Sequence, residues 1–140
     1  MRYICIFLAI QFLLSSCNVK TNEISLAGEW DLLMDSISDP ETKEISGLTF
    51  DKVISLPGTL DDAGFGDPLI IDTALTKEVM TNLKRKVSYI GPAYYSKEIE
   101  IPESWKGNSI SLTMERVLWK SIVWIDDMKI GSENSLTTPH

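Results

Sequence analysis

The chain has few of the residues that most often carry metal or covalent chemistry. Of its 140 residues, only Cys5 and Cys17 are cysteine, and the single histidine is His140. Zinc sites and cysteine nucleophiles need several thiolates or imidazoles near one another. The sequence therefore predicts no metal site, no cofactor and no cysteine nucleophile. Because both cysteines lie within the first 17 residues, we also expect a domain that folds by packing alone, without an internal disulfide.

Positive charge is also scarce. Thirteen Lys and Arg face twenty Asp and Glu, which gives a formal net charge of −7 and leaves no basic stripe. Nucleic-acid binding depends on clustered basic residues that neutralise phosphates, so we expect no nucleic-acid partner. A hydrophobic fraction of 44% and a length of 140 residues suit one globular domain.

The sequence has no apolar run long enough to cross a bilayer comfortably. Residues 4–14 are apolar and follow Arg2, which is the length of a signal-peptide core and too short for a spanning helix of about 20 residues. The next residues, Leu14-Ser15-Ser16-Cys17, resemble the lipobox of bacterial lipoproteins.

This resemblance implies three processing features. Residues 1–16 would be a lipoprotein signal peptide, Cys17 would carry the lipid, and residues 17–23 would form a polar tether. The chain would then be lipid-anchored to a membrane of the bacterial cell envelope, on the periplasmic side or at the cell surface. An ordinary signal peptide with an incidental cysteine is the alternative.

No segment has helical periodicity over more than three turns. Residues 73–86 allow a helix of one or two turns at most, whereas period-two patterns recur along the rest of the chain. We expect strands at residues 30–34 and 52–56, followed by an alternating strand with Tyr95, Ile99 and Ile101 on one face. A second alternating strand would place Ile110, Leu112 and Met114 on one face. These patterns predict strands with one buried face and one wet face.

A β-hairpin is predicted near the C-terminal end. Residues 122–125 are apolar on both faces, which is typical of a central strand, and Asp126-Asp127 supplies a two-residue turn. The partner strand would leave an unpaired sheet edge after Ile130. Short strands separated by turns predict an all-β fold, a β-sandwich.

A long segment, residues 57–88, has neither strand nor helix character in most of its length. Segments of this length in compact domains are usually functional or disordered. Leu69, Ile70 and Ile71 argue against full disorder. Asp61 and Asp62 in this segment could bind the hydroxyls of a ligand, although solvated acids are the simpler interpretation.

Five stretches taken together indicate a family. In order they read LAGEWDLLMD, SLPGT, YIGPAYYSKEIEIP, NSISLTMERV and VWIDDMKIGSENSLTTPH. Their order over residues 24–140 resembles the N-terminal sugar-binding domain of glycoside hydrolase family 2, the family of β-galactosidases, β-mannosidases and β-glucuronidases. Asp126-Asp127 stands where the family usually has Asn-Gly, and SLPGT replaces a more common proline-histidine form.

The resemblance implies a jelly-roll-like, galactose-binding-domain-like β-sandwich that is incomplete at its C-terminus. In the family, an immunoglobulin-like domain and a catalytic barrel follow in the same polypeptide, and both catalytic glutamates lie in the barrel. We therefore expect no catalytic residue in this chain. Its ligand would be a carbohydrate with a terminal β-linked sugar.

The same resemblance suggests sugar contacts. Asn134 occupies the position of a sugar-contacting acid, and Ile90 falls where the family has a contacting asparagine. Arg116 could form a forked pair with a carboxylate, and Trp119 could stack on a sugar. The structural alternatives are a turn at Asn134, an Arg–Glu pair and a packed tryptophan.

Other aromatic residues have a simpler interpretation. We expect packing roles for Trp30, Trp105 and Trp124, and a packing or turn role for His140.

Three functions remain open at this point. The first is a non-catalytic domain of a family 2 exo-β-glycosidase that acts in carbohydrate metabolism. The second is a stand-alone carbohydrate-binding lipoprotein or adhesin. The third is a structural lipoprotein without a ligand.

Overall fold

The computed structural model describes residues 22–69, 74, 76–82 and 85–140. The expected signal peptide, Cys17, Ile70 and Ile71 lie outside these residues. The described part consists mostly of β-strands with one short α-helix, which confirms the predicted all-β class.

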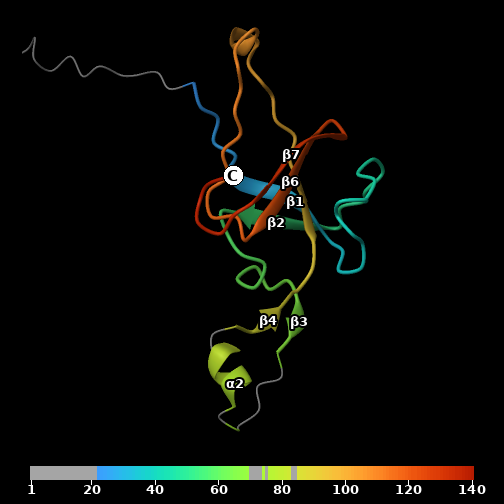
Figure 1. The fold of residues 1–140 in the computed structure, drawn as a ribbon, viewed down its shortest axis with the longest axis vertical. Helices are drawn as coiled ribbons and strands as arrows, with labels where there is room; N and C mark the ends of the chain where they lie inside the picture. The colour runs from blue at the N-terminus through green and yellow to red at the C-terminus, as the bar shows by residue number, and fades with distance from the viewer. Residues whose placement is uncertain (1–21, 70–73, 75, 83–84) are drawn as a thin grey trace, which may run out of the picture.

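A three-stranded antiparallel sheet forms the centre of the fold (Figure 1). Its order is β2 (Lys52–Leu56), β1 (Gly28–Met34), β5 (Ala93–Ser96). The register pairs Trp30 with Ile54 and Leu32 with Tyr95. Alternation along β1 therefore places Trp30 and Leu32 on the same face. β1 and β2 lie where the apolar patterns predict them, and β5 covers only the first part of the third predicted strand.

The predicted hairpin is present as β6 (Lys120–Ile125) and β7 (Met128–Asn134). Both turn residues are left-handed, with φ of 47° at Asp126 and 64° at Asp127. Two successive positive φ values are the geometry of a type I′ turn, which matches the twist of the paired strands. Aspartate tolerates this conformation better than most residues, so the Asp126-Asp127 pair can form the turn.

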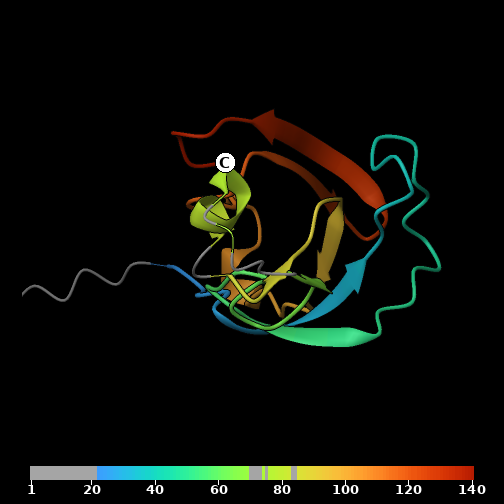
Figure 2. The ribbon, with the colours of Figure 1, turned by 90° about the horizontal axis from the view of Figure 1, so that it is seen from below.

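The hairpin and the sheet lie in separate layers. The hairpin crosses the sheet in Figure 1, and Figure 2 shows the two on opposite sides. Glu41, in the loop after β1, reaches the hairpin and forms ion pairs with Lys120 at 2.5 Å and Lys129 at 2.7 Å. These two lysines lower the pKa of Glu41 from 4.5 to about 2. The loop after β1 thereby connects the two layers.

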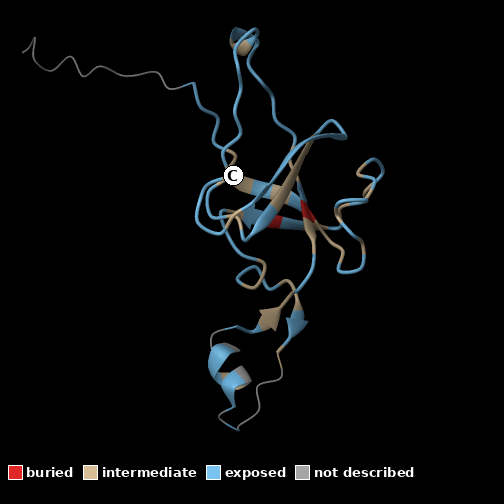
Figure 3. Cartoon of the chain, in the orientation of Figure 1, coloured by how far each residue is buried: buried red, intermediate tan, exposed pale blue. Residues whose placement is uncertain are grey.

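The core is small. Only Leu32, Ile54 and Tyr94 are buried among the described residues, all of them in the three-stranded sheet (Figure 3). The other sheets have two strands each, so the described architecture consists of small, open sheets. β6 pairs only with β7 within the described chain, and its middle residues are half-buried. The expectation of a central strand covered on both sides was therefore wrong.

The long segment 57–88 has more structure than its sequence suggests. β3 (Asp67–Pro68) pairs with β4 (Val87–Ser88) and closes the base of the segment. Between them lies α2 (Lys77–Asn82), which confirms the prediction of a helix of one or two turns. The hydroxyl of Thr76 accepts a hydrogen bond from the backbone N–H of Val79 at 3.3 Å and caps this helix.

Two predicted strand stretches are not strands. β5 ends at Ser96, and residues 97–101 form no strand after it. Residues 109–114 are not a strand either. The 3₁₀ helix η1 (Glu103–Trp105) lies between them, at the tip of the long arm in Figure 1. Ile101 and Ile110 remain 47% and 55% exposed. Alternation creates a face that could be buried, but a strand also needs a partner for its backbone groups.

Candidate functional site

Two of the predicted sugar-contact residues, Trp119 and Asn134, lie in neighbouring backbone rungs at the open end of the hairpin. Asn134 ends β7 and pairs with Lys120, the first residue of β6. The next rung is a hydrogen bond from the backbone N–H of Ser135 to the carbonyl of Trp119 at 3.0 Å. The Trp119 side chain is 63% exposed. Trp119, whose indole is accessible, therefore directly precedes Lys120, the residue that pairs with Asn134.

Ser135, rather than Asn134, makes the turn that follows β7. Its Oγ accepts hydrogen bonds from the backbone N–H of Thr137 at 3.3 Å and of Thr138 at 3.2 Å. The hydroxyl of Thr138 also donates to it, at 2.7 Å. Within the described chain, no hydrogen bond involves the side-chain amide of Asn134. The amide is exposed and can both donate to and accept from a ligand hydroxyl.

His140 fixes the segment that carries this turn. Its Nε2 lies 3.0 Å from the carbonyl of Ser135, and its Nδ1 lies 2.6 Å from Oγ of Ser121 on β6. A carbonyl only accepts, so Nε2 donates to Ser135, while Nδ1 and the Ser121 hydroxyl share the second hydrogen bond. His140 is half-buried, which agrees with the predicted packing role.

Arg116 lies in the loop that leads to Trp119. It has a left-handed backbone, with φ of 59°, and an exposed side chain. Arg116 forms no ion pair with any residue in the described ranges, so the Arg–Glu pair expected as its structural alternative is not present there. The guanidinium of Arg116 is therefore accessible. Like Trp119, Arg116 lies in the loop that precedes β6.

Asp61 and Asp62 belong to a different cluster. The hydroxyl of Thr59 donates to Oδ2 of Asp62 at 2.9 Å, and Nε of Arg85 lies 3.5 Å from Oδ2 of Asp61. Hydrogen bonding by Thr59, assisted by the charge of Arg85, lowers the pKa of Asp61. These contacts hold the loop after Pro57 in shape. The structure does not join either aspartate to the hairpin end by any such contact.

A hollow that the sequence did not reveal lies at the base of the long segment. It has a volume of about 350 Å³ and combines hydroxyls, one carboxylate and apolar side chains. Its lining residues are Ser36, Asp67, Pro68, Leu69, Ser88, Tyr89 and Ile90. Ile90, 88% exposed, is the position where the family resemblance places a contacting asparagine. The only hint in the sequence was the length of segment 57–88.

Two glycines allow the backbone to approach closely around this hollow. A Cβ on Gly66 would lie 2.7 Å from the carbonyl oxygen of Ser88, and one on Gly91 would lie 2.9 Å from Cα of Ser36. Their φ values are 142° and 152°, which side chains rarely adopt. Both positions therefore require glycine for the hollow to keep its shape.

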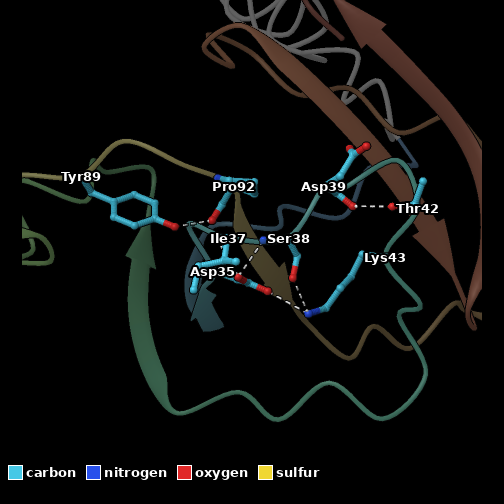
Figure 4. Close-up of polar contacts among 8 residues, drawn as sticks. All are labelled: Asp35, Ile37, Ser38, Asp39, Thr42, Lys43, Tyr89 and Pro92. Atoms are coloured by element: carbon cyan, nitrogen blue, oxygen red, sulfur yellow. Dashed lines mark hydrogen bonds and ion pairs between the residues drawn. The ribbon is translucent and has the colours of Figure 1, made fainter.

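A polar cluster at the end of β1 supports one wall of the hollow (Figure 4). Oδ1 of Asp35 accepts from the backbone N–H groups of Ile37 and Ser38, both at 3.1 Å, and Oδ2 lies 2.8 Å from Nζ of Lys43. The hydrogen bond from Lys43 is the largest cause that lowers the pKa of Asp35 far below its ordinary value. Asp35 is therefore a fixed anion at neutral pH.

Tyr89 connects the hollow to the sheet. Its hydroxyl donates to the carbonyl of Pro92 at 2.6 Å, and the same carbonyl accepts from the backbone N–H of Asp35 at 3.2 Å. Burial raises the pKa of Tyr89. The ring is therefore held as a neutral phenol along the wall of the hollow.

A second, smaller hollow of about 270 Å³ lies beside Trp30. Nζ of Lys97 lies 5.6 Å from the centroid of the Trp30 ring and donates to the carbonyl of Glu29 at 2.8 Å. A lysine over an indole is a cation–π contact. The lysine thereby covers part of the half-buried tryptophan.

Across residues 22–69, 74, 76–82 and 85–140, no three His, Cys, Asp or Glu residues are grouped so that they could hold a metal ion. None of the helices in those ranges has the length and apolar character needed to span a bilayer. A scan against protein-family models found no match to this chain, and a search of curated proteins found none either.

Proposed function

We propose that this chain is the sugar-binding domain of a family 2 exo-β-glycosidase, displayed as a bacterial lipoprotein and itself without catalytic glutamates. In this proposal Trp119 and Asn134 contact a terminal β-linked sugar, and an immunoglobulin-like domain and a barrel belong to the same polypeptide. The jelly-roll-like form of the fold is part of the proposal.

One observation carries the proposal: an exposed indole and an exposed amide with no side-chain hydrogen bond within the described chain lie at one end of the β6–β7 hairpin. Aromatic faces stack on the apolar face of a sugar, and an amide matches its hydroxyls because it both donates and accepts. The Ser135 turn and His140 hold the backbone beside Asn134, so the contact would need little ordering on binding.

Sugar binding tests the proposal directly. Methyl β-D-galactoside, β-D-mannoside and β-D-glucuronide are titrated into the ¹⁵N-labelled chain, and the indole N–H and Asn amide resonances are followed. One sugar is expected to shift the Trp119 and Asn134 resonances, and Trp119→Ala or Asn134→Ala should weaken binding at least about tenfold. Leu136→Ala, an exposed apolar change in the same turn, is the matched control. Equal binding by all three variants would contradict the proposed contacts.

A stand-alone carbohydrate-binding lipoprotein is the second candidate. The hollow of about 350 Å³ favours it, because this volume is near the lower end of small-molecule sites and three hydroxyls line it. In that case Asp67→Asn and Tyr89→Phe, rather than changes at Trp119, would abolish the response to sugar. The same titration therefore separates the two candidates.

A further inference from the structure

One carboxylate bridges two lysines of the hairpin. Oε1 of Glu41 lies 2.5 Å from Nζ of Lys120, at the start of β6, and Oε2 lies 2.7 Å from Nζ of Lys129 on β7. Two ammonium groups that approach one another repel each other, and a carboxylate between them relieves that repulsion. Hydrogen bonds from Lys120 and Lys129 lower the pKa of Glu41 to about 2. The lysine pair therefore stabilises a charged carboxylate.

A turn of the loop after β1 presents Glu41 to these lysines. The backbone N–H of Glu41 donates to Oδ1 of Asp39 at 2.9 Å, and that of Lys43 donates to the carbonyl of Asp39 at 3.0 Å. Figure 4 shows Asp39 and Thr42, which lie on either side of Glu41 in the sequence. The side chains of Glu41 and the two lysines are 38–44% exposed. Ion pairs at this exposure contribute little to stability, so a carboxylate from solution can displace Glu41 and leave the turn intact.

The side chain of Asn134 lies beside this lysine pair. Asn134 is directly opposite Lys120 in the hairpin ladder, and side chains of directly opposed residues share a face with their Cβ atoms about 4.5–5.5 Å apart. The exposed amide of Asn134 forms no side-chain hydrogen bond within the described chain, and an amide can both donate to and accept from a hydroxyl. A ligand with a carboxylate and a hydroxyl a few atoms apart would therefore contact Lys120 and Asn134 together.

We propose that Lys120 and Lys129 form a binding site for the carboxylate of a hydroxy acid, that Asn134 contacts one of its hydroxyls, and that the ligand displaces Glu41. A second carboxylate beside Glu41 would meet a like charge, so the two exclude one another. Glu41 thereby acts as a tethered competitor that lowers the apparent affinity for the ligand. The site shares Asn134 with the proposed sugar contact but does not involve Trp119, and it requires no further domain.

Three probes test the site in the full chain: D-gluconate, its uncharged counterpart D-glucitol, and acetate, which has no hydroxyl. Each is titrated at constant ionic strength while the side-chain Cε–Hε resonances of the lysines are followed by NMR. D-gluconate should shift Lys120 and Lys129, acetate should bind more weakly, and D-glucitol should shift neither. Lys106, which forms a single ion pair with Glu103 at 3.0 Å, is the reference lysine. No shift at Lys120 and Lys129, or an equal shift at Lys106, would overturn the proposed site.

Variants test the roles of the individual side chains. Glu41→Gln removes the tethered competitor and should raise the affinity for D-gluconate at least about tenfold. Glu44→Gln removes the same charge from the same loop and is the control, so equal gains in the two variants would overturn the role of Glu41.

Two further changes locate the contacts within the site. Lys129→Gln should abolish the binding of D-gluconate in the Glu41→Gln background, and Asn134→Ala should weaken D-gluconate without changing acetate. Unchanged D-gluconate binding in either variant would overturn that contact. Trp119→Ala should leave D-gluconate binding unchanged, although it should weaken the methyl glycosides titrated above. Failure of the sugar titration alone would therefore count against the proposed function, and failure of the D-gluconate titration alone against this inference.

Discussion

The imidazole of His140 and the hydroxyl of Ser121 are in direct hydrogen-bond contact, with 2.6 Å between Nδ1 and Oγ, although 19 positions separate the two residues. Ser121 lies on β6, so this contact connects the segment after β7 to β6. The first prediction concerns this pair.

His140→Ala should lower the free energy of unfolding by about 1–3 kcal/mol, because the half-buried hydroxyl of Ser121 and the carbonyl of Ser135 each lose a partner. Ser121→Ala removes one of these bonds and should cost about 0.5–1.5 kcal/mol. Urea unfolding of both variants and the double variant gives the coupling between them. Strictly additive losses would show that the contact contributes nothing.

Glu41→Gln should weaken the connection between the loop after β1 and the hairpin, because an amide cannot form ion pairs with Lys120 and Lys129. The folded pKa of Glu41 is about 2, below its ordinary 4.5. Its stabilising contribution is therefore fully present above pH 4.5 and is lost as the pH falls through the folded pKa.

Thermal unfolding at several pH values measures this dependence. Glu41→Gln should lower Tm slightly at pH 7, and the difference from the unmodified chain should shrink between pH 4.5 and 2. Glu44→Gln in the same loop removes the same charge from a residue whose side chain, among the described residues, is hydrogen-bonded to Ser46 alone, and it is the control. A Glu41→Gln difference that is independent of pH, or equal to that of Glu44→Gln, would contradict the ion-pair assignment.

Gly91→Ala should distort the hollow beside Tyr89. The new Cβ would lie 2.9 Å from both Cα of Ser36 and the Tyr89 hydroxyl, on a backbone with φ of 152°. Such backbone strain typically costs about 1–3 kcal/mol. We expect Gly91→Ala to lower the free energy of unfolding by an amount near the upper end of this range. Gly47→Ala, at φ of 83° with no atom within 4 Å, has the backbone strain without the clash. Chemical denaturation should show the smaller loss for Gly47→Ala; equal losses would mean that the close approach is not required.

Trp119→Ala should separate stability from binding. The side chain is 63% exposed, so its removal should change the free energy of unfolding by no more than about 0.5 kcal/mol. Trp124→Ala on β6, where the indole is half-buried, should destabilise the hairpin more. Melting curves of the two variants check this order. A large loss for Trp119→Ala would identify it as a packing residue and remove the main support for a sugar contact.

The sequence predicted the strands whose residues alternate or form apolar runs and also find a partner. Trp30, Ile54 and the Asp126-Asp127 turn all lie as expected, because local pattern and turn chemistry agree there with the tertiary pairing. Residues 109–114 have an equally regular pattern but no strand assignment, since period two predicts a face and not the partner that pairs with it.

The hollow beside β3 and β4 could not be predicted from the sequence, for a different reason. β3 and β4 have two residues each, which is too short to show any period, and the close approach of Gly66 to Ser88 is a tertiary contact between residues far apart in sequence. The long segment 57–88 could be recognised as unusual, but the residues it brings together could not. At the hairpin end, the sequence indicated Trp119 and Asn134, whereas the roles of Ser135 and Ser121 emerge only from the fold.

The most direct test of whether this chain is part of a glycosidase is to sequence the complete reading frame that contains the codon of His140. If this chain is the sugar-binding domain of a family 2 enzyme, the frame continues through an immunoglobulin-like domain into a barrel with two catalytic glutamates. The expressed product should then hydrolyse a chromogenic β-galactoside, β-mannoside or β-glucuronide. A stop codon immediately after His140 would contradict that function.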